Sequence, residues 1–371
     1  MTSLPCSVAS SGPADATITP LLQIPTFRNW VRTVIWTLVI VGLCGTVYWF
    51  DKYEGWFEFK VRRDADVRLL RNPATFAMRA FGIPHFAIAF MFVLSSRRMK
   101  QARNRVLFGL LMIASVGVCY LFYRWGAHTS PFAVFLFYFY FIIHGFRDDS
   151  YFYKTYGDMP EEARATHQRM MKVLECLSVG LLFSFLWPAY AQLASTSPRY
   201  HDPILANFFP ADWPFVIRLS SMFIPMLLIA GFVLWRMAGG FAGGARAFWR
   251  THRPVLSIYL LTMGIILLAP AVGPWTFDTY ILMHFVGWFL IALYLIRRFP
   301  PAQAPTTWWA WMRQSRTGFI TLHFALVAVT VGLMAVSTYA FGKDSMIETI
   351  IGAPGFYYWT LIHVTTSFVP R

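Results

Sequence analysis

Histidine side chains inside long apolar segments are the residues of this sequence whose chemistry stands out. They are His85, His144, His284, His323 and His363. A titratable side chain is costly to place in a segment apolar enough to cross a membrane, so each is a functional candidate. A neutral imidazole is the commonest protein ligand of a redox metal or a haem iron. Several apolar helices that each direct one histidine inward could therefore hold a single metal ion.

The structural alternative for each histidine is a hydrogen bond that links two helices. Such a link contributes on the order of 1 kcal/mol. Serine or threonine can make it at lower cost, so five histidines in one apolar bundle favour a shared metal or haem site. The other four of the nine histidines fall in expected loops and are interpreted as solvated side chains: His128, His167, His201 and His252.

An acidic side chain follows one of these histidines at helical spacing. The stretch Phe135–Tyr156 reads FLFYFYFIIHGFRDDSYFYKTY, in which Asp148 lies four residues after His144. If the helix continues, the two side chains share a face. The carboxylate could then bind the same metal, or it could hold the second imidazole nitrogen and fix its tautomer. We expect Asp148 to be a catalytic residue, whereas Asp149 is better explained by contact with the lipid headgroups.

The elements that must position these side chains are apolar blocks of about 20 residues, the length that a helix needs to cross a membrane. The chain is 57% apolar and only 13% charged. In lipid a helix satisfies its own backbone hydrogen bonds, so we predict an all-α transmembrane bundle of about ten spans. They are Trp30–Phe50, Phe76–Ser96, Val106–Trp125, Pro131–Phe146, Val173–Ala194, Pro214–Trp235, Pro254–Val272, Thr276–Ile296, Phe319–Phe341 and Phe356–Val369.

The positive charge is distributed as in a membrane protein. The net charge of +15 comes mainly from Lys and Arg in every second loop, at 97–105, 147–172, 236–253 and 297–316. That alternation follows the positive-inside rule and predicts that both termini are cytoplasmic, in a bacterial-type inner (plasma) membrane. The loop Asp51–Arg71 departs from the pattern because it is rich in basic residues on the expected outer side. Since the basic residues lie between spans, we expect no nucleic-acid partner.

The chain divides into a short leader and one membrane domain. Residues 1–26 are rich in Ser, Pro, Thr and Ala and lack a basic region before an apolar core, so they are interpreted as a flexible leader. Residues 27–371 contain no long linker and are expected to form a single transmembrane domain. The four cysteines show no paired spacing of the kind that indicates a disulfide framework or a zinc site.

Two short motifs resemble a known family. The sequence Gly82-Ile83-Pro84-His85, followed by Ile142-Ile143-His144 with an acidic residue just beyond, resembles the Brp/Blh-type β-carotene dioxygenases. The resemblance implies a multi-span protein that cleaves a carotenoid with a histidine-ligated non-haem iron. His85, His144, His284 and His363 occur in the order of that family's histidines. The chain departs from it after His85, where Phe86 replaces Gly, and at Trp288, where the family has a second histidine.

The favoured function is a membrane oxidoreductase or oxygenase that binds iron through His85, His144, His284 and His363, with His323 as a further ligand. Its expected substrate is a lipophilic isoprenoid, carotenoid or acyl chain, taken from the bilayer. Non-haem iron is favoured, and a b-type haem with paired axial histidines is the second enzyme hypothesis. A proton-coupled transporter that uses the histidines and Asp148 as a relay, a metal-free acyltransferase and a structural subunit are also compatible with the sequence.

Overall fold

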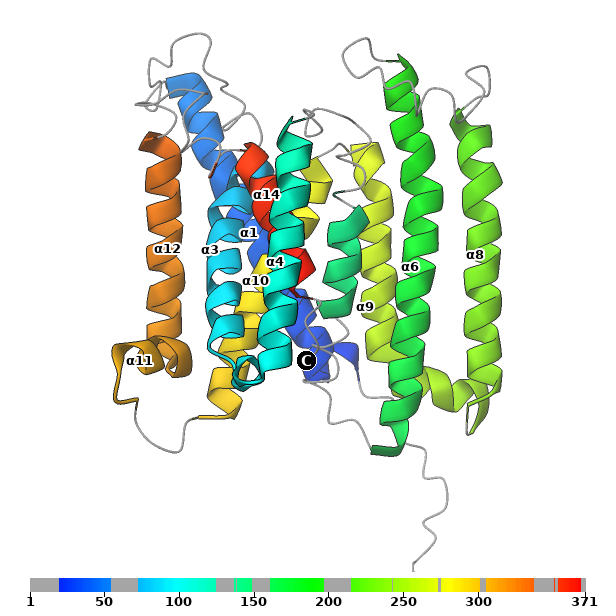
Figure 1. Cartoon of the computed structure of the whole chain (residues 1–371). Coiled ribbons are helices and arrows are strands. Elements are labelled where there is room, and N and C mark those ends of the chain that lie inside the picture. The colour runs from blue at the N-terminus through cyan, green and yellow to red at the C-terminus, as the bar shows by residue number, and fades with distance from the viewer. Residues whose placement is uncertain are drawn as a thin grey trace, which may run out of the picture.

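The described part of the chain is built from helices alone. The computed structural model describes residues 20–54, 73–124, 137, 139–148, 161–196, 215–241, 243–272, 275–300, 305–336, 350 and 353–367. Every regular element in these ranges is a helix (Figure 1). The all-helical fold predicted from the sequence is thus confirmed for this part of the chain.

Most of the helices coincide with the apolar blocks, whereas α6 and α9 begin well before theirs. The helices are α1 (Pro25–Glu54), α3 (Pro73–Leu94), α4 (Ala102–Arg124), α6 (Glu161–Thr196), α8 (Phe215–Gly239), α9 (Gly244–Val272), α10 (Trp275–Arg298), α11 (Trp308–Gln314), α12 (Arg316–Val336) and α14 (Ala353–Thr366). Residues 139–148 are also helical and are called the His144 segment below. Residues 1–19 of the expected leader lie outside the described residues, and α1 already begins at Pro25.

Six helices in the described ranges are long and apolar enough to cross a membrane. The qualifying stretches are Pro25–Thr46, Phe76–Leu94, Ala102–Phe122, Ser220–Gly239, Asp278–Arg298 and Arg316–Val336. The expected spans Val173–Ala194 and Pro254–Val272 are helical too, within α6 and α9, but they are not among these six. The chain therefore has the character of a multi-span membrane protein, and the larger number of spans stays a prediction.

Large apolar side chains point outward from several of these helices. On α4, Ile113 is 72% exposed, and on α8, Leu228 is 68% exposed. Water would make such surfaces unfavourable, whereas lipid tails match them. The outward faces are therefore suited to contact with a bilayer.

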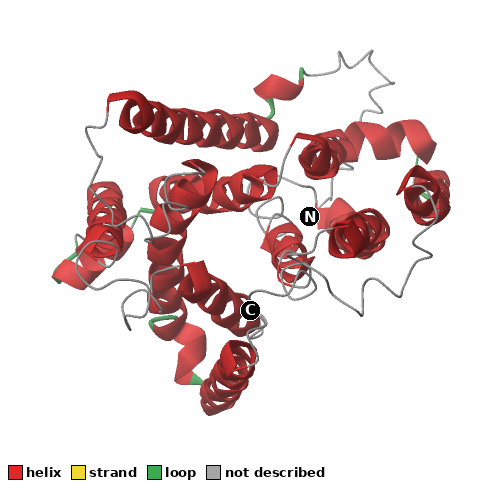
Figure 2. Cartoon of the chain, turned by 90° about the horizontal axis from the view of Figure 1, so that it is seen from above, coloured by secondary structure: helices red, strands yellow, loops and turns green. Residues whose placement is uncertain are grey.

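Helix α10 is the element around which the candidate site is assembled. It packs against α3, α1, α9 and α12, while α14 packs against α3 and α4. Helix α1 crosses one side of the bundle obliquely (Figures 1 and 2). The His144 segment joins this group through a hydrogen bond between Tyr140 Oη and Thr365 Oγ1 of α14, 3.1 Å long. Its Phe146 ring also lies 5.6 Å from the Tyr259 ring of α9.

A short helix fixes one end of α3 against the start of α12. Thr307 caps the start of α11, because its hydroxyl accepts a hydrogen bond from the Ala310 amide at 3.1 Å. Its Arg313 donates to the Ser95 hydroxyl at 3.0 Å and to the Ser95 carbonyl at 3.3 Å. The guanidinium also lies 5.5 Å from the centre of the Phe92 ring. These contacts anchor the end of α3, the helix that carries His85.

Candidate metal centre

Four of the five predicted histidines meet in the interior. They come from four elements: His85 from α3, His144 from the His144 segment, His284 from α10 and His363 from α14. The His85 ring centre lies 5.5 Å from that of His284 and 5.0 Å from that of His363. The His144 ring centre lies 5.2 Å from that of His284 and 5.1 Å from that of His363. The four rings thus form a closed cycle of neighbours.

These separations match the spacing of imidazoles around one metal ion. Histidine nitrogens lie about 2.0–2.1 Å from a bound metal, so ligand rings at tetrahedral angles have centres about 5 Å apart. All four measured neighbour separations lie between 5.0 and 5.5 Å. The ring separations are therefore compatible with one shared ion.

A glycine makes room for the aromatic walls of the centre. Gly82 lies one turn before His85 on α3, and a Cβ there would come within 2.6 Å of both the Phe285 and the Phe356 rings. The Phe285 ring centre is 4.8 Å from that of His85, and the Phe86 ring centre is 5.0 Å from that of His363. Phenylalanine rings therefore close around the histidines and limit the access of water.

The hydrogen bonds around His144 assign its tautomer. The Ser367 hydroxyl donates its one proton to the Val364 carbonyl, with an O···O distance of 2.6 Å. The same hydroxyl oxygen lies 3.2 Å from His144 Nδ1. Because the hydroxyl proton is already used, Nδ1 must carry the proton and donate to Ser367. In the neutral imidazole the other nitrogen, Nε2, then carries a lone pair that faces the centre.

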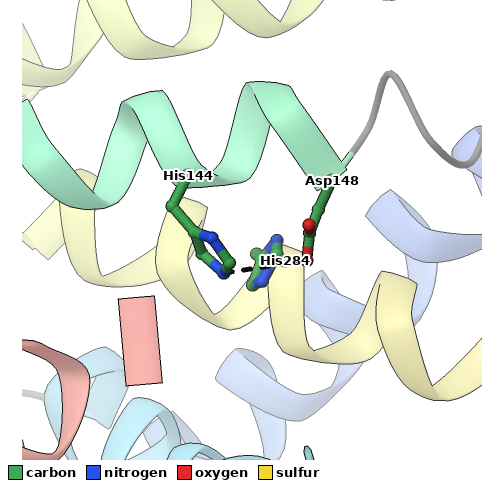
Figure 3. A group of neighbouring side chains, drawn as sticks. All are labelled: His144, Asp148 and His284. Carbon is green, nitrogen blue, oxygen red and sulfur yellow. Dashed lines mark ion pairs between the residues drawn. The ribbon is translucent and has the colours of Figure 1, made fainter. Parts of the chain in front are cut away.

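Asp148 lies beside that lone pair. Its Oδ2 is 3.6 Å from His144 Nε2, and both side chains point from one helix towards His284 of α10 (Figure 3). One ligand atom each from His144, Asp148 and His284 lies within 4.8 Å of the other two. A carboxylate and an imidazole lone pair are both acceptors and repel each other unless a cation lies between them or one of them takes up a proton. Ser367 already holds the second nitrogen of His144, Nδ1. The arrangement therefore favours Asp148 as a direct ligand of the metal.

Burial makes the histidine cluster costly without a bound cation. His85 is 0% exposed and His284 is 6% exposed, and within the described structure none of their ring nitrogens has a hydrogen-bond partner. A buried polar group that lacks a partner costs about 1–3 kcal/mol. A metal ion would satisfy one nitrogen of each ring. These histidines are therefore better explained as metal ligands than as side chains that only pack in the core.

The fifth predicted ligand lies apart from the four. His323 is buried on α12, where its ring packs 4.6 Å from Phe289 and 5.8 Å from Phe319. In the described part of the chain its ring contacts are with these phenylalanines and not with the cluster. Trp288 occupies the place next to His85 instead, with its ring perpendicular to the imidazole at 4.8 Å. The structure therefore brings together four histidines and Asp148 and leaves His323 outside.

Two histidines that the sequence places in solvated loops are in fact buried. His167 is 3% exposed near the start of α6, and His252 is 0% exposed near the start of α9. The interpretation of both as solvated side chains is wrong, because α6 and α9 begin as helices well before their apolar blocks and pack against each other. His128 and His201 lie outside the described residues.

Comparisons with known proteins add no family to this picture. No protein-family model matches the chain, and neither a curated protein nor a solved structure matches it. The resemblance to the carotenoid dioxygenases therefore stays a prediction.

The donor set itself restricts the chemistry. Four neutral imidazoles and one carboxylate are borderline ligands that suit divalent iron, zinc, copper or nickel and do not suit calcium or magnesium. Ser367 is a member of this site that sequence reasoning missed. The only sequence signal for it was its position four residues after His363, one helical turn away.

Proposed function

We propose that this protein is a membrane-embedded oxidoreductase or oxygenase with a non-haem iron held by His85, His144, His284 and His363, assisted by Asp148. The observation that carries the proposal is that one ligand atom each from His144, Asp148 and His284 lies within 4.8 Å of the other two. The ring of His85, whose nitrogens have no hydrogen-bond partner among the described residues, lies beside them, 5.5 Å from that of His284. Iron bound there would supply dioxygen activation or electron transfer. The chain's own part is to hold the ligands, fix the His144 tautomer and exclude water.

Non-haem iron fits the cluster better than haem b. A b-type haem takes two axial histidines, one on each face of a wide porphyrin plane. Here each of two histidines, His85 and His144, neighbours both His284 and His363 at 5.0–5.5 Å. Any axial pair chosen from such a cycle would leave the remaining rings in the space that the porphyrin needs.

A lipophilic substrate is supported by the surroundings of the site. The centre is walled by phenylalanine rings, and the helices around it expose apolar side chains suited to lipid. A substrate dissolved in the bilayer could reach such a centre without passing through water. Isoprenoids, carotenoids and acyl chains all have this character. The resemblance to the carotenoid dioxygenases favours oxidative cleavage of a carbon–carbon double bond, in which both atoms of O₂ end in the two carbonyl products and no external reductant is consumed.

The proposal includes a topology of about ten spans in a bacterial-type inner membrane, with both termini cytoplasmic. The alternation of basic loops supports it, because positively charged loops are retained on the cytoplasmic side. Reporter fusions at the loops 97–105 and 126–130 would test this orientation. We expect the first to report the cytoplasm and the second the opposite side.

Metal analysis of the purified protein tests the central part of the proposal. The protein would be expressed in iron-replete cells, purified in mild detergent, and measured for iron content and absorbance. We expect near-stoichiometric iron without a Soret band. His85→Ala, His144→Ala and His284→Ala should each remove it, whereas His323→Ala, a buried histidine outside the cluster, should retain it.

Two outcomes would overturn the proposal. A wild-type protein without metal would leave the histidines as proton relays, a metal-free catalytic base or helix links. A Soret band that disappears with His85→Ala would replace non-haem iron with haem. Consumption of O₂ in the presence of isoprenoids or unsaturated acyl chains, compared between wild type and His284→Ala, then tests the oxygenase reaction itself.

A further inference from the structure

We propose that His167 and His252 form a second metal site, separate from the four-histidine centre, which takes a monovalent soft cation of the copper(I) type. The two side chains come from α6 and α9, helices that pack against each other. Their ring centres are 5.8 Å apart, and the ring planes are inclined by only 22°.

The pair has the features of a binding site and lacks those of a solvated surface. His167 and His252 are 3% and 0% exposed, and all four of their ring nitrogens lack a hydrogen-bond partner within the described structure. Burying four such atoms unpaired is unfavourable. An ion bound about 2 Å from one nitrogen of each ring would hold the ring centres about 5–6 Å apart, and the observed separation falls in that range.

The surroundings select a soft ion of low charge. Phe248 and Phe241 pack against His252 at ring separations of 4.9 and 5.5 Å, so the site is walled by aromatic rings. Among the described residues, no cysteine or carboxylate joins the two imidazoles to complete a set of three ligands. A divalent ion would need more ligands and more charge compensation. A two-coordinate or three-coordinate monovalent copper needs neither.

Two methionines are available to add a thioether. Met170 and Met171 follow His167 by three and four residues on α6, which places them on the same side of the helix one turn on. Both are buried, at 0% and 8% exposure. Thioether sulfur is a soft ligand that favours copper(I) over zinc or iron. The combination of two imidazoles and a neighbouring thioether therefore points to copper(I) and not to a second iron.

The protonation state at neutral pH suits a metal ligand. Burial first, and the neighbouring His252 second, lower the pKa of His167 to about 4. Burial also lowers the pKa of His252. Both side chains precede the apolar spans expected at Val173 and Pro254, at the cytoplasmic end of the bundle. Both imidazoles are thus neutral at pH 7, with lone pairs open to an ion delivered from the cytoplasm.

Copper(I) titration of the metal-free protein tests this site. Because copper could also bind the four-histidine centre, the titration is made in a His284→Ala background, in anaerobic detergent solution, with a chromophoric copper(I) chelator as competitor. We expect one copper(I) per chain. Adding His167→Ala or His252→Ala should weaken binding by more than about 100-fold, since even the loss of an outer-shell partner costs about 10–100-fold. Adding His323→Ala, which removes a buried histidine elsewhere, should leave the affinity unchanged.

X-ray absorption at the copper edge tests the ligands without disturbing the pair. In the copper-loaded His284→Ala protein, we expect imidazole scattering from two rings and a sulfur contribution that disappears in Met170→Leu with Met171→Leu. Two results would overturn the proposal: copper(I) bound equally well when both His167 and His252 are replaced, or a copper spectrum without imidazole scattering. The failure of either test leaves the iron content of the unaltered protein untouched, so this inference and the proposed function stand or fall separately.

Discussion

Ser367→Ala is the substitution that most sharply separates a metal centre from a packed histidine core. In the structure, Ser367 accepts from His144 Nδ1 at 3.2 Å and gives its own proton to the Val364 carbonyl at 2.6 Å. Alanine removes that acceptor. The imidazole must then bury an Nδ1–H without it, at a cost of about 1–3 kcal/mol, or move the proton to Nε2 and lose the lone pair that faces Asp148.

Either response should weaken metal binding with little loss of fold. Outer-shell partners of ligand histidines typically contribute about 10–100-fold in metal affinity, which corresponds to about 1.4–2.8 kcal/mol. We therefore expect Ser367→Ala to reduce iron affinity by that factor in a chelator competition assay, and Ser367→Thr, which keeps the hydroxyl, to restore most of it.

Ser184→Ala provides the matched control. Ser184 is more deeply buried than the half-buried Ser367, and its hydroxyl donates in the same way to the Leu181 carbonyl three residues earlier at 3.0 Å. Among the described residues, no hydrogen bond joins it to a histidine. We expect this variant to bind iron as the wild type does. If Ser367→Ala binds iron within twofold of Ser184→Ala, the assignment of the His144 tautomer and the role of Ser367 are both refuted.

Three further perturbations follow from the same geometry. Asp148→Asn keeps the side-chain size but removes the charge, and its amide can donate to Nε2 of His144. We therefore expect the iron content to fall at least tenfold while the detergent-solubilised protein stays monodisperse. If the variant retains all of its iron, Asp148 is not part of the centre. Gly82→Ala should lower the free energy of unfolding by about 1–3 kcal/mol, measured by thermal unfolding, because the added Cβ overpacks against the Phe285 and Phe356 rings. Gly109→Ala is the control: an added Cβ there has nothing within 4 Å, so the variant should be neutral or stabilising. Equal effects of the two substitutions would contradict the packing around Gly82. Because the pKa of His167 is about 4 in the fold and about 6.5 when unfolded, both states are neutral above pH 6.5, and the unfolded state alone gains the proton as the pH falls to 4. Stability should therefore drop by about 2–3 kcal/mol over that interval, and His167→Leu should reduce the drop; an unchanged pH profile in that variant would refute the assignment.

The sequence predicts the participants of the main site better than its geometry. A histidine in a helix that crosses lipid is energetically costly, so intramembrane position predicts five candidate ligands, the four of the cluster and His323. The spacing between His144 and Asp148 is local to one helix, and the structure retains it. Which helices are neighbours depends on tertiary packing, and no sequence period reports it. That is why the separation of His323 from the cluster was not foreseen.

The missed residues share a physical reason. The burial of His167 and His252 arises because α6 and α9 begin before their apolar blocks and bring the two rings together. Hydropathy marks the part of a helix that meets lipid and says nothing of a polar extension that packs on another helix. Ser367 was missed because a serine at the end of an apolar helix is ordinarily a cap or a headgroup contact, and only its distance from His144 gives it a role.

X-ray absorption at the iron edge of the purified, unaltered protein tests whether the four histidines hold an iron ion. We expect one iron per chain, with nitrogen and oxygen ligands at about 2.0–2.2 Å and multiple scattering from three or four imidazoles. Iron with no more than one imidazole ligand, or a protein purified from iron-replete cells without iron, would contradict it.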